Sequence, residues 1–261
     1  MLGRMRWALL ALLLVTGLLA GPASAQEPPF TGTAFIEPGT ITASDPSAYK
    51  SIKYAGRGKR EVFDRRKGPD GRFITINAFL FTATYADGGK LEAQVNPEFG
   101  SRATALTQAR KYARVIGLLP RVLRGKVKAL FIHKGNKDYG GGQLRGVGHI
   151  VIHVGRTPEY ERDGVLEEIL VHEATHVALD PKHAEAAGWR SAQKADPTFI
   201  STYARDYSDS EDVAESFLPW LALRYRRDRM DEDDANTVQQ TMPNRLAYFD
   251  RQKFNVAPLN R

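Results

Sequence analysis

Hydrophobic side chains follow a strand-like pattern in the first half of the chain and a helical one in the second. Residues 73–85 are dense in β-branched and aromatic side chains, residues 90–95 form a shorter run, and Asp87-Gly88-Gly89 separates the two. Two such runs around a tight turn predict a β-hairpin. Apolar runs at residues 127–133 and 149–154 predict two further short strands, joined by a glycine-rich segment.

Apolar residues recur at helical spacing in two longer segments. Ser101 can cap a helix that Gly117 ends. A second helix is predicted over residues 163–179, with Asp163 as its cap and Asp180 directly after it. Beyond this point the sequence signals are almost wholly helical.

The order of these elements predicts an α+β fold. Residues 69–180 would form a lobe with a small mixed sheet and two helices, and residues 181–261 a helical lobe, with a cleft between them. Residues 26–68 are rich in Pro, Gly, Ser and Thr and lack sustained periodicity. They predict an extended N-terminal arm with one or two short strands.

The first 25 residues predict a signal peptide. Arg4 and Arg6 precede the apolar residues 7–20, and the small residues Ala23-Ser24-Ala25 follow. The apolar run is too short to span a bilayer. Cleavage after Ala25 would give a secreted or periplasmic protein that keeps no membrane-inserted segment.

The composition limits which kinds of site this chain, predicted to be exported, can form. It contains no cysteine, so disulfides and thiolate chemistry are excluded, and any metal must be held by His, Asp or Glu. The formal net charge is +7, and loss of the two leader arginines leaves 35 − 30 = +5. The basic residues are spread along the chain in small clusters, which favours a solvated surface over a nucleic-acid site and equally allows attraction to anionic polymers of the cell envelope.

Residues 172–176 read His-Glu-Ala-Thr-His and match the H-E-x-x-H pattern. One helical turn separates His172 and His176, so both imidazoles can reach a single zinc ion at about 2.0 to 2.1 Å. Glu173 points elsewhere and is positioned to act as a general base beside the open coordination position. Two surface histidines on an ordinary helix are the alternative.

A catalytic zinc site needs a third protein ligand, because it usually has three and one open position. The metzincin form is excluded by the residues that follow His176. Glu211 and Glu215 share one face of a further predicted helix, and one of them is the favoured third ligand. His183 and Asp180 are weaker candidates, and Asp180 is better suited to a hydrogen bond behind the ligands. The alternative for Glu211 is a capping box with Ser208.

The H-E-x-x-H motif together with Tyr203-Ala204 and the segment Glu-Asp-Val-Ala-Glu-Ser-Phe at residues 211–217 resembles the zincin-like, gluzincin-type metallopeptidases of the anthrax lethal factor catalytic domain family. The resemblance covers residues 166–217. It implies a zincin-like fold with one Zn²⁺ held by His172, His176 and Glu211. It further implies that Tyr203 assists catalysis, with Tyr207 as the alternative, and that Glu215 lies behind the ligands.

His149 and His153 alternate with apolar residues along a predicted strand. Zincin-like folds bind extended peptides along an edge strand near the active-site helix. By that resemblance these two histidines would lie on the substrate-aligning strand.

These features predict an exported zinc-dependent metallohydrolase, most simply a peptidase acting on a peptide or protein substrate. Two alternatives stay open. One is a non-catalytic binding protein of the cell envelope with a structural zinc site, and the other is a hydrolase of non-protein amides such as peptidoglycan cross-links.

Overall fold

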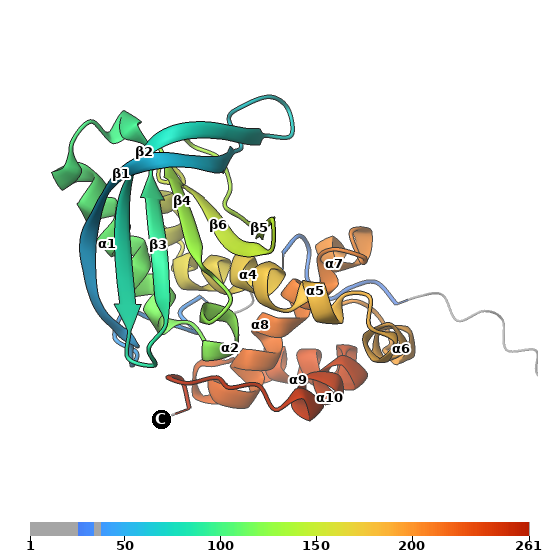
Figure 1. The fold of residues 1–261 in the computed structure, drawn as a ribbon. Coiled ribbons are helices and arrows are strands. Elements are labelled where there is room, and N and C mark those ends of the chain that lie inside the picture. The colour runs from blue at the N-terminus through green and yellow to red at the C-terminus, as the bar shows by residue number, and fades with distance from the viewer. Residues whose placement is uncertain (1–25, 34–37, 261) are drawn as a thin grey trace, which may run out of the picture.

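The computed structural model describes residues 26–33 and 38–260, so the predicted signal peptide lies outside the described residues. The described chain has the predicted α+β class, with a mixed six-stranded sheet and ten α-helices (Figure 1). The strands are β1 (Tyr49–Asp64), β2 (Arg72–Tyr85), β3 (Lys90–Val95), β4 (Ala129–His133), β5 (Gly140–Leu144) and β6 (Val147–His153). Their order in the sheet is β1-β2-β3-β4-β6-β5. Strands β3, β4 and β6 run parallel, whereas the β1–β2, β2–β3 and β5–β6 pairs are antiparallel.

The predicted hairpin is confirmed as β2 and β3, and the two predicted short strands are confirmed as β4 and β6. The prediction of an extended N-terminal arm with only short strands is wrong, because β1 is a 16-residue strand paired with β2 along its length. Most of β1 is exposed or half-buried, so its sequence carries no sustained apolar alternation. Strand β5 was also missed, because its Gly140-Gly141-Gly142 run offers no side chains from which a strand can be recognised.

Two helices flank the same face of the sheet. Helix α1 (Arg102–Leu118) has the predicted cap, in which Ser101 Oγ accepts the Thr104 N–H at 3.1 Å. Helix α4 (Leu166–Ala178) begins later than predicted, after Val165 and without a side-chain cap. Asp163 instead follows the short helix α3 (Thr157–Arg162), and Gly164, at φ +69°, turns the chain into α4.

The chain after α4 is helical, as predicted. Figure 1 shows α4 between the sheet and these C-terminal helices. They are α5 (Asp180–His183), α6 (Ala187–Ala195), α7 (Thr202–Asp206), α8 (Asp212–Tyr225), α9 (Glu232–Thr241) and α10 (Pro243–Gln252), and α2 (Arg121–Arg124) precedes β4. No helix among the described residues is both long and apolar enough to cross a bilayer.

The sheet is covered on both faces. One large hydrophobic core joins the sheet, α1, α4 and the C-terminal helices, and buries Ile150 and Ile152 of β6. On the other face, Val62, Phe131 and Val151 form a small cluster. Figure 1 shows β1 and β2 bending across the sheet. Strand β6 is therefore interior, and β5 is the edge strand next to α4.

Candidate metal centre

Helix α4 carries two histidines into a cleft. His172 and His176 are four residues apart on a helix with 3.6 residues per turn, so their side chains lie one above the other. Their Nε2 atoms are 3.1 Å apart. His172 is buried and His176 is half-buried, and both line the cleft, so their Nε2 atoms lie at its floor rather than in bulk water.

Glu211 comes to the same point from the beginning of α8. Its Oε2 atom lies 3.2 Å from His172 Nε2 and 3.1 Å from His176 Nε2. Glu211 is the residue before the first turn of α8 and makes no side-chain capping bond, so the capping-box alternative with Ser208 is wrong. His183 is also wrong as a ligand, because it is buried with Nδ1 2.7 Å from the Tyr248 hydroxyl.

These three atoms fit a zinc ion. Donor atoms about 2.0 to 2.1 Å from one tetrahedral ion lie about 3.3 Å from each other. The observed spacings of 3.1, 3.1 and 3.2 Å are close to that value. Two imidazoles and one carboxylate are also a donor set that suits zinc. Among the described residues, this is the group of three His, Asp or Glu side chains that converges on one point.

Carboxylates behind the ligands orient both imidazoles. Asp180 Oδ2 lies 2.6 Å from His176 Nδ1, and Glu215 Oε1 lies 3.3 Å from His172 Nδ1. Glu215 is buried, and its Oε2 accepts a 2.6 Å hydrogen bond from Ser201 Oγ. Such contacts fix the imidazole tautomer and leave Nε2 free to bind the metal.

The pKa values of the two imidazoles and of Glu211 are shifted because carboxylates and imidazoles lie so close together in the metal-free site. Burial alone would lower the pKa of His172, but hydrogen bonds to Glu211 and Glu215 outweigh it and raise the pKa to about 9. Burial would also lower the pKa of His176, but hydrogen bonds to Asp180 and Glu211 outweigh it and raise this pKa to about 11. Burial would raise the pKa of Glu211, yet the two imidazoles hold it well below its usual range. The acid therefore stays ionised and available as a ligand.

A salt-bridge network fixes the start of α8. Arg245 of α10 is fully buried, and its Nε donates to Asp196 Oδ2 at 2.8 Å. Its Nη1 donates to Asp212, the residue directly after Glu211. The guanidinium thus ties α10 to the turn that presents the third candidate ligand.

Tyr203 and Glu173 complete a cleft of about 700 Å³ above the three donors. Burial, followed by the charge of Glu211, raises the pKa of Tyr203 to about 12, so its hydroxyl keeps its proton. Tyr207 packs its ring against Tyr203 but is 57% exposed and is not among the lining residues. Of the two tyrosines, Tyr203 is the one in the cleft.

An N-terminal segment helps to position Tyr203. The Thr202 N–H donates to Phe30 O at 2.9 Å, and the Tyr203 N–H donates to Gly32 O at 3.2 Å. Thr33, the next residue, lines the cleft. The Thr202 hydroxyl also takes part, since its Oγ1 accepts the Gly32 N–H at 2.8 Å. Sequence reasoning missed this contact because its partners are 170 residues apart.

The prediction that His149 and His153 lie on an edge strand beside the active-site helix is wrong. Strand β6, which carries them, lies between β4 and β5 and is not an edge strand. His149 is stacked on Phe131 at 4.5 Å, on the sheet face that points away from α4. Neither histidine lines the metal cleft, whereas Gly141 and Gly142 of the edge strand β5 do.

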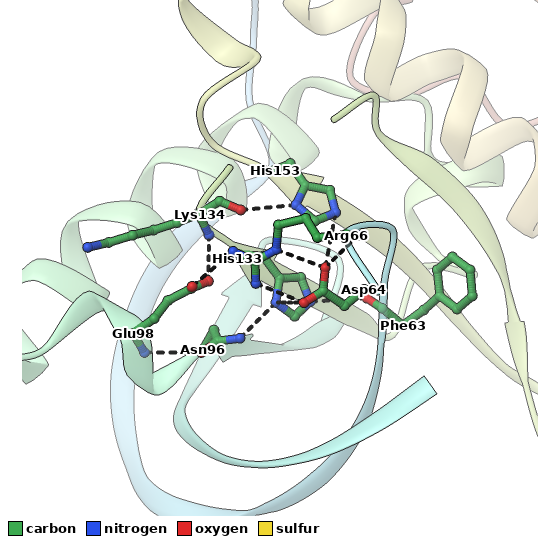
Figure 2. A network of polar contacts seen from close by, with 8 residues as sticks. All are labelled: Phe63, Asp64, Arg66, Asn96, Glu98, His133, Lys134 and His153. Atoms are coloured by element: carbon green, nitrogen blue, oxygen red, sulfur yellow. Dashed lines mark hydrogen bonds and ion pairs between the residues drawn. The ribbon is translucent and has the colours of Figure 1, made fainter. Parts of the chain in front are cut away.

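His153 belongs to a separate buried network around Asp64 (Figure 2). Its Nδ1 donates to Lys134 O at 3.1 Å, and its Nε2 lies 3.9 Å from Asp64 Oδ1. His133 stacks on it, with ring centroids 5.3 Å apart. Burial lowers the pKa of both imidazoles, to about 4 for His133. Both are therefore neutral near pH 7 and serve the packing of this corner.

Sequence reasoning also missed two arginines that line the cleft, Arg65 and Arg156, because their local sequences resemble ordinary basic surface. Comparisons with protein-family models, with curated proteins and with solved structures find no match to this chain. The converging donors on α4 and α8 are therefore the main guide to its function.

Proposed function

We propose that this protein is an exported zinc-dependent peptidase with a zincin-like fold. The observation that supports the proposal most is the convergence of His172 Nε2, His176 Nε2 and Glu211 Oε2 to within 3.2 Å, at the floor of a cleft that also contains Glu173 and Tyr203. Three protein ligands leave one coordination position open, which is typical of catalytic rather than structural zinc.

Zinc bound there would lower the pKa of a coordinated water and polarise the substrate carbonyl. Glu173 accepts a proton from the attacking water and delivers it to the leaving amine. Tyr203, still protonated because its pKa is about 12, donates a hydrogen bond to the oxyanion that develops on the carbonyl. Asp180 and Glu215 hold the two imidazoles in the tautomer that leaves Nε2 free.

The edge strand β5 suits an extended polypeptide as substrate. In the described chain its outer edge pairs with no other strand, and its glycines line the cleft beside Glu173. A peptide can add to such an edge through backbone hydrogen bonds, which places its carbonyl groups along the cleft. Binding of this kind favours unfolded or flexible segments of proteins.

Glu173→Gln tests the proposal, because the amide is nearly isosteric with the carboxylate but cannot accept the proton. We expect zinc content to stay at one per chain while kcat on an unstructured protein substrate falls by about 10² to 10⁴-fold. Tyr203→Phe should keep the zinc and give a smaller loss of kcat. A Glu173→Gln protein with full activity, or a zinc-loaded wild type that cleaves nothing across a broad panel of substrates, would favour the structural-zinc alternative.

A further inference from the structure

A second hollow adjoins the metal cleft across strand β5. It is a recess of about 210 Å³ on the sheet face that points away from α4. Its walls include three aromatic rings, those of Phe63 and Phe73 from the bent β1–β2 hairpin and of His149 from β6. The recess and the cleft share Arg65, Gly141 and Gly142, so they are continuous around the edge of the sheet.

The glycines of β5 keep both hollows open. A Cβ on Gly141 would lie 2.0 Å from Glu173 O, so this residue must be glycine for the edge strand to pack against the active-site helix. A Cβ on Gly140 would lie 2.6 Å from Arg65 Nη2, and a Cβ on Gly142 would point at His149. Alternate positions of a strand face opposite ways. Gly140 and Gly142 therefore leave room for Arg65 and for a ligand on the recess side.

Arg65 is the unpaired cation at this junction. It is exposed and has no hydrogen bond or ion pair to any described residue. Arg156, the other arginine that lines the cleft, has its Nε 3.0 Å from Asp138 and its Nη1 2.8 Å from Glu159. A guanidinium that no internal acid neutralises is free to bind a carboxylate from outside.

The turn that carries Arg65 is held firmly. Next to it, Arg66 donates from its backbone N–H and from Nε to Asp64 Oδ1, both at 2.9 Å, and from Nη2 to Asp64 Oδ2 at 2.8 Å (Figure 2). Asp64 is completely buried, and Arg66 Nη1 reaches Glu98 at 2.9 Å. These bonds clamp the end of β1, so the guanidinium of Arg65 lies against β5.

We infer that Arg65 and the aromatic recess form a subsite that recognises a carboxylate on the polypeptide bound in the metal cleft. The inference rests on the proposed peptidase function. Successive side chains of a peptide paired with β5 point to opposite faces of the sheet. A residue next to one that faces the metal therefore points into the recess, where its carboxylate meets Arg65. That carboxylate belongs either to an Asp or Glu side chain or to the end of the substrate chain.

Matched peptides separate these two sources. Cleavage of zinc-loaded wild type is measured on pairs that differ only by Glu or Gln beside the scissile bond, each made with a free and with an amidated C-terminus. We expect a preference of about tenfold in kcat/KM for the carboxylate, the value of one charge-assisted contact. A Glu-over-Gln preference identifies the side chain, and an acid-over-amide preference identifies the chain end.

Two variants should abolish the preference by different routes. Arg65→Ala removes the guanidinium. Gly140→Ala displaces it, because the new Cβ would lie within 2.6 Å of Arg65 Nη2, and this flexible side chain can move away at little cost in stability. Arg110→Ala is the control, since it removes another exposed arginine, on α1, and the same charge. We expect the control to keep the tenfold ratio, and both test variants to bring it close to one.

Binding of the same peptides to zinc-loaded Glu173→Gln protein can be measured by fluorescence anisotropy. This measurement needs no turnover. A carboxylate preference in binding that is lost with Arg65→Ala supports the subsite even if no peptide is cleaved. Peptides that are cleaved or bound with no carboxylate preference, or with a preference that survives Arg65→Ala, overturn the subsite and leave the peptidase proposal standing.

Discussion

Glu168 provides a pH-dependent test of the fold beside the candidate metal centre. It lies on α4 one turn before His172, is completely buried, and accepts the Ile41 N–H at 2.9 Å through Oε1. Burial raises the pKa of this carboxyl from 4.5 to about 7. The folded protein therefore holds the proton more tightly than the unfolded chain does.

The size and sign of the effect follow from the shift in pKa. One pKa unit corresponds to about 1.4 kcal/mol, so ionisation of Glu168 costs the folded state about 3 kcal/mol. Because the folded pKa is raised, this stability is fully present below pH 4.5, is lost as the pH rises to about 7, and stays lost above that. Glu168→Gln cannot ionise and escapes this loss. Any cost of burying its amide is the same at every pH.

The measurement is urea unfolding of both proteins between pH 4 and 8. We expect the free energy of unfolding of the wild type to fall by about 3 kcal/mol relative to Glu168→Gln across this range. The metal site is common to both proteins, so its own pH dependence cancels in the difference. Asp70→Asn, at an exposed aspartate, controls for the loss of one acid and should run parallel to the wild type. Parallel profiles for Glu168→Gln as well would refute the buried, protonated state of Glu168.

Three further expectations concern the metal centre and its support. Glu211→Ala should remove most of the zinc, as should alanine at either histidine, whereas Glu215→Ala should weaken binding less; metal analysis showing the opposite order for the two glutamates would reverse their roles. Zinc binding near pH 7 should release at least one proton, because the pKa values of His172 and His176 lie at about 9 and 11 in the metal-free protein; calorimetry in buffers of different ionisation enthalpy measures this, and no net release would contradict it. Arg245→Leu should destabilise the protein by about 3 to 5 kcal/mol in denaturant unfolding, because it leaves two buried aspartates unpaired; a loss below about 1 kcal/mol would mean that they are hydrated.

The parts of the fold that could be predicted from the sequence are those with local, periodic signals. The β2–β3 hairpin and helix α1 combine dense apolar patterns with clear turn or cap residues, and the structure confirms both. The histidines of α4 could be placed on one face because helix geometry alone fixes residues four apart. The structure brings Glu211 to them, and sets Asp180 and Glu215 behind them.

The parts that were missed depend on contacts distant in sequence or on an absence of side chains. Strand β1 is paired on one side only and is largely solvated, so no buried face marked it. Strand β5 is recognisable only from what its glycines approach. The apolar pattern of β6 does not show that it is an interior strand, because a strand's place in the sheet is a property of the whole topology.

The contact of Phe30 and Gly32 with the turn before Tyr203 has a consequence for biosynthesis. The cleft is lined by residues from distant parts of the chain, among them Thr33, His172 and Glu211, and a segment near the predicted mature N-terminus holds Tyr203 in place. Contacts of such long sequence separation require closure of a long loop and are therefore slow to form. A ribosome-bound or unfolded chain has the H-E-x-x-H motif but neither Glu211 nor Tyr203 beside it. Under the proposed peptidase function, the site would be assembled only after the chain has folded as far as residue 211.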